Sequence, residues 1–199
     1  MSLLSRATGT TRARHRNDFY RTIDPRAVAA LLPHLTPGAR FLEPCAGDGS
    51  LIALLEAAGL DCYGRFDLEP ACPYIPRRDA FALEPGADGA REGTIITNPP
   101  WHRATLHALI AHFVAVAEEA WLLFDSSWCQ TRQARSLGER WCSDVVAAGR
   151  LKWFEGSAHD ATDDCSWYRF SADKAGPTRY WWPLGVPRQA RDERQGVLL

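Results

Sequence analysis

The sequence lacks the features of a membrane or secreted protein. No uninterrupted apolar run approaches the roughly 18 residues that a membrane-spanning helix needs. Between Met1 and Arg16 the only large apolar side chains are Leu3 and Leu4, which excludes the apolar core of a signal peptide. The six cysteines include no Cys-x-x-Cys pair, which argues against a zinc ribbon and is typical of reduced thiols. These absences predict a soluble, cytoplasmic protein with no membrane partner and no metal site.

The sequence also lacks an excess of charge of either sign. Its 23 Lys and Arg residues and 24 Asp and Glu residues leave a formal net charge of −1. This excludes a protein that binds nucleic acid through bulk positive charge, so any contact with a polyanion has to be local. Hydrophobic residues make up 46% of the 199 residues, which is enough for the core of one domain. The unusual feature is aromatic, because tryptophan occurs eight times and methionine once.

The sequence predicts a basic arm at 1–18, a single domain at 19–185 and a polar tail at 186–199. Asp24-Pro25 is typical of a helix start, and Pro37-Gly38 of its end. Beyond them, short apolar runs alternate with segments of helical periodicity. The expected strands cover 39–43, 60–67, 94–97, 121–124, 151–154 and 167–170, with another that ends near Asp79, and the further helices cover 50–58, 106–117 and, broken or in two pieces, 130–148. This alternation predicts an α/β fold with a mostly parallel sheet, helices on both faces and an antiparallel hairpin at the edge.

The segment 41–51, Phe-Leu-Glu-Pro-Cys-Ala-Gly-Asp-Gly-Ser-Leu, joins an expected strand to an expected helix through a glycine turn. Gly47 and Gly49 allow positive φ and a close approach of the backbone to a ligand, beside the free N–H groups of a helix start. A dinucleotide-binding turn would have a third glycine at the position of Ile52. Instead an acid, Glu43, stands four residues before the first glycine. The dinucleotide interpretation is therefore weakened.

Acidic residues also follow the next two expected strands. Asp67 ends the second strand, where the two oxygens of a carboxylate can accept both hydroxyls of a ribose. Asp79 can accept an adenine amino group while Phe81 covers the ring. A lone acid at a strand end is more often structural or solvated. Three acids in register with one glycine turn favour a cofactor that contains a nucleoside.

The segment Asn98-Pro99-Pro100-Trp101 follows the strand expected at 94–97. A plain strand end would explain the prolines but not the residues on either side of them. The Asn98 side-chain oxygen and the Pro99 carbonyl can hold both hydrogens of an exocyclic amine, whose lone pair is then directed at an electrophile. Trp101 can stack on a base, a contact worth about 1–3 kcal/mol in single-strand sites. The segment predicts catalysis by orientation, without a strong base.

Together these two motifs resemble class I S-adenosylmethionine-dependent methyltransferases that act on amino groups, whose catalytic motif is Asn, Asp or Ser, then Pro-Pro, then an aromatic residue. The likeness covers 18–170 and is greatest to small phage and prophage DNA adenine-N6 enzymes. The related cytosine-N4 enzymes more often have Ser at the first position of the motif, so Asn98 favours adenine. The resemblance implies a seven-stranded Rossmann-like fold, a bacterial or phage-infected cell, and S-adenosyl-L-methionine as cofactor. The segment Asp18-Phe-Tyr-Arg-Thr22 matches an N-terminal cofactor motif, although Ile23 stands where the family has proline. The implied cofactor residues are Tyr20, Thr22, Glu43, Pro44, Ala46, Gly47, Gly49, Asp67, Leu68, Asp79, Ala80, Phe81 and Asn98.

The chain has little length beyond the methyltransferase core, so we expect low or very short sequence specificity. Trp101 and Trp128 are candidates to contact the base, and Arg103 and Arg132 to contact phosphates, although such arginines are often a solvated helix face. A base in a duplex would have to be flipped, which favours unpaired or single-stranded DNA. We expect a monomer or a weak homodimer. The alternatives are methylation of RNA adenine or of protein glutamine, and a non-catalytic nucleic-acid-binding module that keeps the fold.

Overall fold

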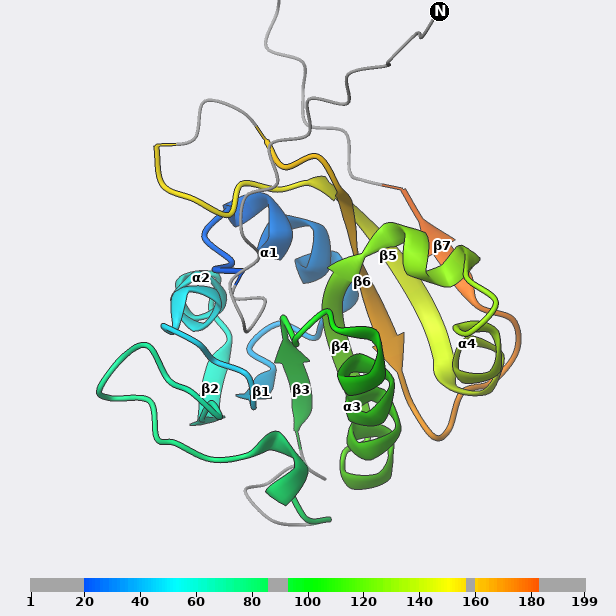
Figure 1. Cartoon of the computed structure of the whole chain (residues 1–199), viewed down its shortest axis with the longest axis horizontal. Coiled ribbons are helices and arrows are strands. Elements are labelled where there is room, and N and C mark those ends of the chain that lie inside the picture. Colours follow the sequence, from blue (N-terminus) through cyan, green and yellow to red (C-terminus); the bar gives the residue numbers. More distant parts are fainter. Residues whose placement is uncertain (1–19, 86–92, 157–159, 183–199) are drawn as a thin grey trace, which may run out of the picture.

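The computed structural model describes residues 20–85, 93–156 and 160–182 (Figure 1). The predicted arm at 1–18 and tail at 186–199 lie outside the described residues. The helices are α1 (Pro25–Leu31), α2 (Ser50–Ala57), α3 (Arg103–Val116) and α4 (Arg135–Trp141), with short 3-10 turns at Leu32–His34, Ala80–Ala82 and Ser126–Gln130. The strands are β1 (Arg40–Glu43), β2 (Asp61–Arg65), β3 (Thr94–Thr97), β4 (Glu119–Asp125), β5 (Cys142–Arg150), β6 (Asp164–Phe170) and β7 (Arg179–Trp181). None of the helices in these ranges is long and apolar enough to cross a bilayer.

The strands form one seven-stranded sheet in the order β2-β1-β3-β4-β6-β5-β7. β6 is antiparallel to β4 and β5, and the other pairs are parallel. In Figure 1 the arrows of β3 and β6 accordingly point in opposite directions. The strand expected to end near Asp79 is reduced to a single bridge between Asp67 and Arg77. The predicted α/β fold with a mostly parallel sheet is confirmed.

The helix expected over 130–148 is wrong beyond Trp141, because Cys142–Arg150 form the strand β5 between β6 and β7. Val145 and Val146 belong to two different apolar clusters, as successive residues of a strand must. Pairing with β6 along the strand, and with β7 over Asp144–Val146, outweighs the helical propensity of Ala147 and Ala148. The antiparallel pair near the sheet edge is therefore β5 with β6, and β7 lies outside it.

The strand expected over 151–154 is also wrong, because this backbone bonds to loops rather than to a neighbouring strand. The amide of Lys152 donates to the Asp24 carboxylate at 2.9 Å, and the carbonyl of Leu151 accepts from Ala161 at 3.0 Å. Asp24 also caps α1, as predicted, by accepting the amide of Arg26 at 3.0 Å. Burial acts to raise the pKa of Asp24, but hydrogen bonds from the Arg26 guanidinium, and then from the two amides, hold it below the usual range. One carboxylate thus joins the start of α1 to the segment after β5.

Two apolar clusters lie on opposite faces of the sheet, which confirms helices on both faces. One contains Ile95 of β3 together with the buried side of α3, and α4 packs against it. The other contains the next residue, Ile96, together with the buried sides of α1 and α2. This alternation is the two-residue period of a strand covered on both faces. Figure 1 shows α3 and α4 on the near side of the sheet.

The strand directions bring five connecting segments to one edge of the sheet. β1, β2, β3 and β4 run parallel, and β5 runs the same way because β6 reverses direction between β4 and β5. The segments that follow these strands therefore share the carboxyl edge, where ligands bind in sheets of this kind. They cover 44–49, 66–79, 98–102, 126–134 and 151–156.

Candidate functional site

The glycine turn lies between β1 and α2, as predicted. Gly47 and Gly49 have φ of 55° and 83°, values that residues with a Cβ rarely adopt, so both positions require glycine. Asp67, after β2, fixes the turn by accepting the amide of Gly47 at 2.8 Å and that of Glu69 at 2.7 Å. The amide of Ala71 donates to the Gly47 carbonyl at 3.0 Å, so the segment after β2 closes against the turn. Each oxygen of Asp67 still has a lone pair to offer a ligand hydroxyl.

Glu43, at the end of β1, is the most unusual polar group of this region. Its side chain is 1% exposed, and Oε2 has no hydrogen-bond partner among the described residues. Burial raises the pKa of Glu43 well above its usual range, the negative charges of Asp67 and Asp48 reinforce the rise, and Arg65 opposes it. A buried acceptor without a donor is costly unless a ligand supplies the donor. Glu43 therefore fits a ligand that brings a cationic or N–H group to the glycine turn.

The N-terminal segment at 20–23 lies against the same turn. Arg21 pairs with Asp48 of the turn, and its second nitrogen lies 3.6 Å from Glu155 of the segment after β5. Thr22 is buried, with 3% of its surface exposed, and its hydroxyl accepts a hydrogen bond from the Asn98 side chain. Asp18, the first residue of the predicted motif, lies outside the described residues.

Asn98 follows β3, and its side-chain amide is held on three sides. Nδ2 donates to the Tyr20 carbonyl and to the Thr22 hydroxyl, each at 3.0 Å, while Oδ1 accepts the indole N–H of Trp101 at 2.9 Å. A carbonyl can only accept and an indole N–H can only donate, so these partners determine which way the amide faces. Oδ1 retains one lone pair, and that is the acceptor that an exocyclic amine would need. The structure therefore brings Tyr20, Thr22, Asn98 and Trp101 together.

Three aromatic rings lie beside this amide. The Trp101 ring is 4.9 Å from that of Tyr20 at 32°, and 5.7 Å from that of Trp153 at 84°. Trp153 also lies 5.5 Å from Tyr20. The strand expected over 151–154 would place Trp153 in the core or on a sheet face. Trp153 is indeed buried in the core, but it lies in a loop after β5, which brings its ring to Trp101. The only local signal was an apolar residue at every second position of 151–154.

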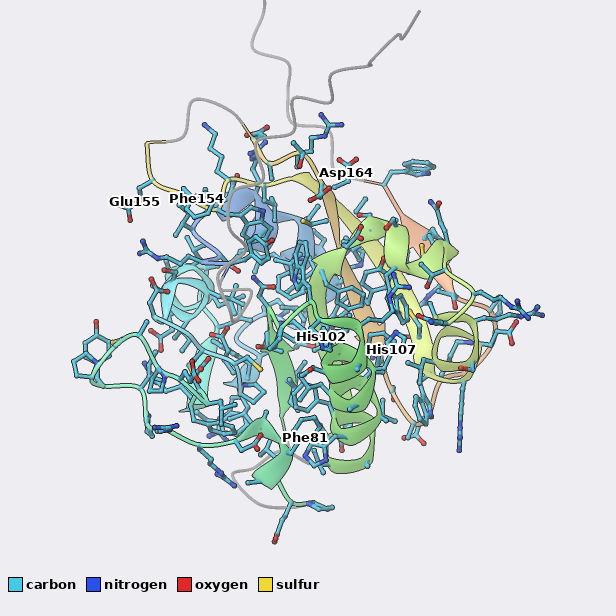
Figure 2. The ribbon with its side chains drawn as sticks, in the orientation of Figure 1. Phe81, His102, His107, Phe154, Glu155 and Asp164 are labelled. Carbon is cyan, nitrogen blue, oxygen red and sulfur yellow. The ribbon has the colours of Figure 1, made fainter. Side chains whose placement is uncertain are left out.

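The other predicted cofactor residues differ in whether their side chains are buried or exposed. Pro44 and Ala46 are buried in the glycine turn, and the side chain of Leu68 is exposed. Asp79 caps the turn Ala80–Ala82 by accepting the amide of Phe81 at 3.0 Å, and Ala80 is buried. The Phe81 ring packs 5.5 Å from His112, in the second half of α3. Figure 2 shows Phe81 well apart from His102, the residue that precedes α3.

Trp128 is placed in the core. It is 4% exposed, its ring packs 5.3 Å from Phe124 and 5.2 Å from Tyr168, and its indole N–H donates to Nε2 of His107 at 3.0 Å. Burial, reinforced by Arg103, lowers the pKa of His107, which keeps that nitrogen an acceptor. A ring this deeply buried offers almost no surface to a base. Trp128 is therefore a core residue and not a base contact.

The two predicted phosphate contacts are exposed at the carboxyl edge. Arg103 begins α3 and donates to the Gln133 side chain at 3.0 Å, next in sequence to the exposed Arg132. On another part of this edge Glu155 and Asp164 are exposed, and Figure 2 shows both at a distance from His102. Within the described ranges no group of three or more His, Cys, Asp or Glu residues could hold a metal ion.

Comparisons with known proteins relate this chain to methyltransferases by fold. No family model matches the sequence, and no curated protein does. A candidate class I S-adenosylmethionine-dependent methyltransferase of Listeria monocytogenes has a TM-score of 0.52 and 10% identity, over 81% of this chain and 65% of that one. The 23S rRNA methyltransferase ErmE has a TM-score of 0.50 and 14% identity, over 80% and 71% of the two chains. The methyltransferase subunit of a type I restriction-modification system from Streptococcus thermophilus has a TM-score of 0.51 and 10% identity, over 78% of this chain but 44% of its own. The chain therefore has the Rossmann-like class I methyltransferase fold.

Proposed function

We propose that this protein transfers a methyl group from S-adenosyl-L-methionine to the exocyclic N6 amine of adenine in DNA. The observation that carries the proposal is the fixed amide of Asn98. Its Oδ1 lies on the edge that also holds the glycine turn and the unpartnered Glu43. The fold, which is that of class I methyltransferases, supports the same chemistry.

The residues present fit this cofactor. Glu43 supplies a buried carboxyl for its cationic part, and Asp67 supplies lone pairs for ribose hydroxyls. When bound, S-adenosylmethionine supplies an electrophilic methyl group. Thr22 and the backbone of Tyr20 hold the Asn98 amide, so the same segment connects the cofactor side of the site to the acceptor side.

Asn98 and Pro99 act on the amine by orientation. One amine hydrogen is donated to Asn98 Oδ1 and the other to the Pro99 carbonyl, which favours a pyramidal nitrogen with its lone pair directed at the methyl group. Pre-formed acceptors of this kind need no reorganisation during the reaction, which makes them effective. The methylated amine is then acidic enough to release its proton to water.

The choice of DNA adenine rests on the sequence motif, in which Asn precedes the two prolines. Fold neighbours include enzymes named for ribosomal RNA and for restriction-modification, so RNA adenine is the second candidate. We expect isotopically labelled S-adenosylmethionine to transfer label to N6 of adenine in DNA, more to single-stranded than to duplex oligonucleotides, because an unpaired base needs no flipping. Mass spectrometry of digested products identifies the acceptor. Label found only in RNA or only in protein overturns the assignment to DNA, and binding of cofactor without transfer to any acceptor indicates a non-catalytic module.

A second prediction concerns the nucleic-acid contact. Arg103 and Arg132 are exposed beside the site, and the acidic side chains Glu155 and Asp164 lie on another part of the edge, so we propose that the phosphate backbone follows the α3 side. Arg103→Gln and Arg132→Gln should each weaken binding of a single-stranded oligonucleotide several-fold. Each should also reduce the slope of log affinity against log salt by about 0.7, the value for one phosphate contact on a single strand. Fluorescence anisotropy at several salt concentrations measures both.

The matched control for these variants is Arg40→Gln. Arg40 begins β1, at the opposite edge of the sheet, and forms an exposed pair with Asp61 at 3.3 Å. It should leave affinity and salt slope unchanged. If the three variants behave alike, the phosphate backbone does not follow the α3 side.

A further inference from the structure

Trp153 is a buried aromatic residue that the mechanism above does not use. It is 5% exposed and lies in the segment after β5, far in sequence from Asn98. The backbone just before it is anchored by two hydrogen bonds, from the Lys152 amide to Asp24 at 2.9 Å and from the Ala161 amide to the Leu151 carbonyl at 3.0 Å. Trp153 is therefore held in place independently of β3 and of the segment that carries Asn98.

The ring contacts of Trp153 connect Tyr20 and Trp101, the two residues that hydrogen-bond to opposite ends of the Asn98 amide. Tyr20 accepts from Asn98 Nδ2, and Asn98 Oδ1 accepts from the Trp101 indole. The Trp101 ring then meets Trp153 edge-on at 5.7 Å, and Trp153 meets Tyr20 again at 5.5 Å. Edge-to-face pairs of aromatic rings have a preferred geometry and stabilise it by about 0.5–1.5 kcal/mol beyond the area they bury. Trp153 thus limits where the Trp101 ring can lie.

The position of the Trp101 indole has a chemical consequence. Its N–H occupies one lone pair of Asn98 Oδ1, so the direction from which it donates determines which lone pair stays available to the substrate amine. We propose that Trp153 is a positioning residue for methyl transfer: it acts through Trp101 to fix the free lone pair of Asn98 Oδ1. The inference rests on the proposed function of Asn98, and it gives a role to the contacts that the buried Trp153 ring makes with Tyr20 and Trp101.

The test compares Trp153→Leu, which removes the ring, with Trp153→Phe, which keeps a smaller one. We expect Trp153→Leu to lower kcat by at least about 10-fold, since a misplacement of about 1 Å can cost up to 100-fold. Trp153→Phe should lower kcat a few-fold in the same direction. KM for S-adenosylmethionine should change less than kcat, because Trp153 reaches the cofactor side only through the Tyr20 ring, whereas it meets Trp101, the indole donor to Asn98, directly. A larger rise in KM with unchanged kcat overturns the proposal.

A second readout does not depend on activity. The indole N–H of Trp101, whose resonance is assigned from its absence in Trp101→Phe, should exchange with solvent faster in both Trp153 variants, and most in Trp153→Leu, because its bond to Asn98 Oδ1 is less well held. A shift of the resonance by itself is not counted, because loss of the Trp153 ring changes the ring current at this proton. Trp121→Phe is the control, because Trp121 is 1% exposed and belongs to the cluster with α1 and α2. It should reduce the free energy of unfolding while leaving kcat and the solvent exchange of the Trp101 indole N–H unchanged.

The outcomes separate this inference from the proposed function. If wild-type protein transfers no methyl to any nucleic acid, the proposed function fails, and the solvent exchange of the Trp101 indole N–H still decides whether Trp153 positions that indole. Unchanged solvent exchange of the Trp101 indole N–H in both Trp153 variants overturns the inference. So does a loss of kcat in Trp121→Phe as large as in the Trp153 variants, since it would show a general effect of lost core packing. If Trp153→Leu does not fold, Trp153→Phe gives the same comparison.

Discussion

Asn98→Ala should lower methyl transfer by at least about 100- to 1,000-fold, the usual cost of removing one pre-formed hydrogen-bonding group that acts in the transition state. The variant loses the acceptor Oδ1 and leaves the indole N–H of Trp101 without its partner. The Pro99 carbonyl alone would then hold one amine hydrogen and leave the nitrogen lone pair free to turn. The measurement is single-turnover transfer from labelled S-adenosylmethionine with saturating DNA.

Binding of the cofactor should survive this change. Glu43 and Asp67 stay in place, and Asn98 contacts the cofactor side only through Tyr20 and Thr22, so calorimetry should give a Kd within a few-fold of the wild-type value. Asn98→Asp is the informative companion, because it keeps an acceptor oxygen but removes both N–H donors. It should retain partial activity. A Kd that rises by more than about 10-fold in Asn98→Ala, equal to about 1.4 kcal/mol, would instead make Asn98 chiefly a cofactor residue.

The position of the glycine turn could be predicted because its signals are local. Gly47 and Gly49 are needed by the turn itself, with φ of 55° and 83°, and both follow closely after Glu43, the last residue of β1. The four-residue motif after β3 is equally contiguous. The parallel order of the strands then brings these two segments to one edge, a consequence of topology that the alternation of strands and helices already implied.

The errors fall where long-range pairing decides the structure. Residues 142–148 have moderate helical propensity, and only pairing with β6 and β7 makes them a strand. Once β5 extends to Arg150, the following residues become a loop, and Trp153 moves from an expected sheet face to the side of Trp101. The wrong strand boundary near the edge of the sheet thus hid the contact between Trp153 and Trp101.

The expected base contact at Trp128 shows a related difficulty. A tryptophan just after a strand end on the ligand side can line a site or fill the core, and the sequence is the same in both cases. The decision depends on Phe124, Tyr168 and Phe170, which come from two strands and surround the ring. His107, from α3, supplies the indole with an acceptor, so no ligand is needed to satisfy it.

Glu43→Gln should weaken binding of S-adenosylmethionine and, separately, change how the stability of the protein depends on pH. The substitution keeps the shape and removes the charge. It should raise the Kd for S-adenosylmethionine by about 10- to 100-fold, as expected for the loss of a hydrogen bond worth about 1.5–3 kcal/mol to a charged group. Glu56→Gln is the control, because Glu56 is an exposed residue of α2 that pairs with Arg65 at 3.4 Å, and its Kd should equal that of the wild type.

The pH dependence gives the same carboxyl a distinct signature. Burial raises the pKa of Glu43 well above its ordinary 4.5, so the folded protein without ligand holds this proton more tightly than the unfolded chain does. The associated stability is complete below 4.5 and is lost as the pH rises through the folded-state pKa. Glu43→Gln has no such proton to lose, and its Tm relative to wild type should therefore increase with pH. Because a cationic ligand requires the carboxylate, affinity of the wild type should rise over the same range, and binding should release a proton, measurable by calorimetry in buffers of different ionisation enthalpy. Affinity that is flat with pH in the wild type, together with an unchanged Kd in Glu43→Gln, would show that the cation of the ligand lies elsewhere.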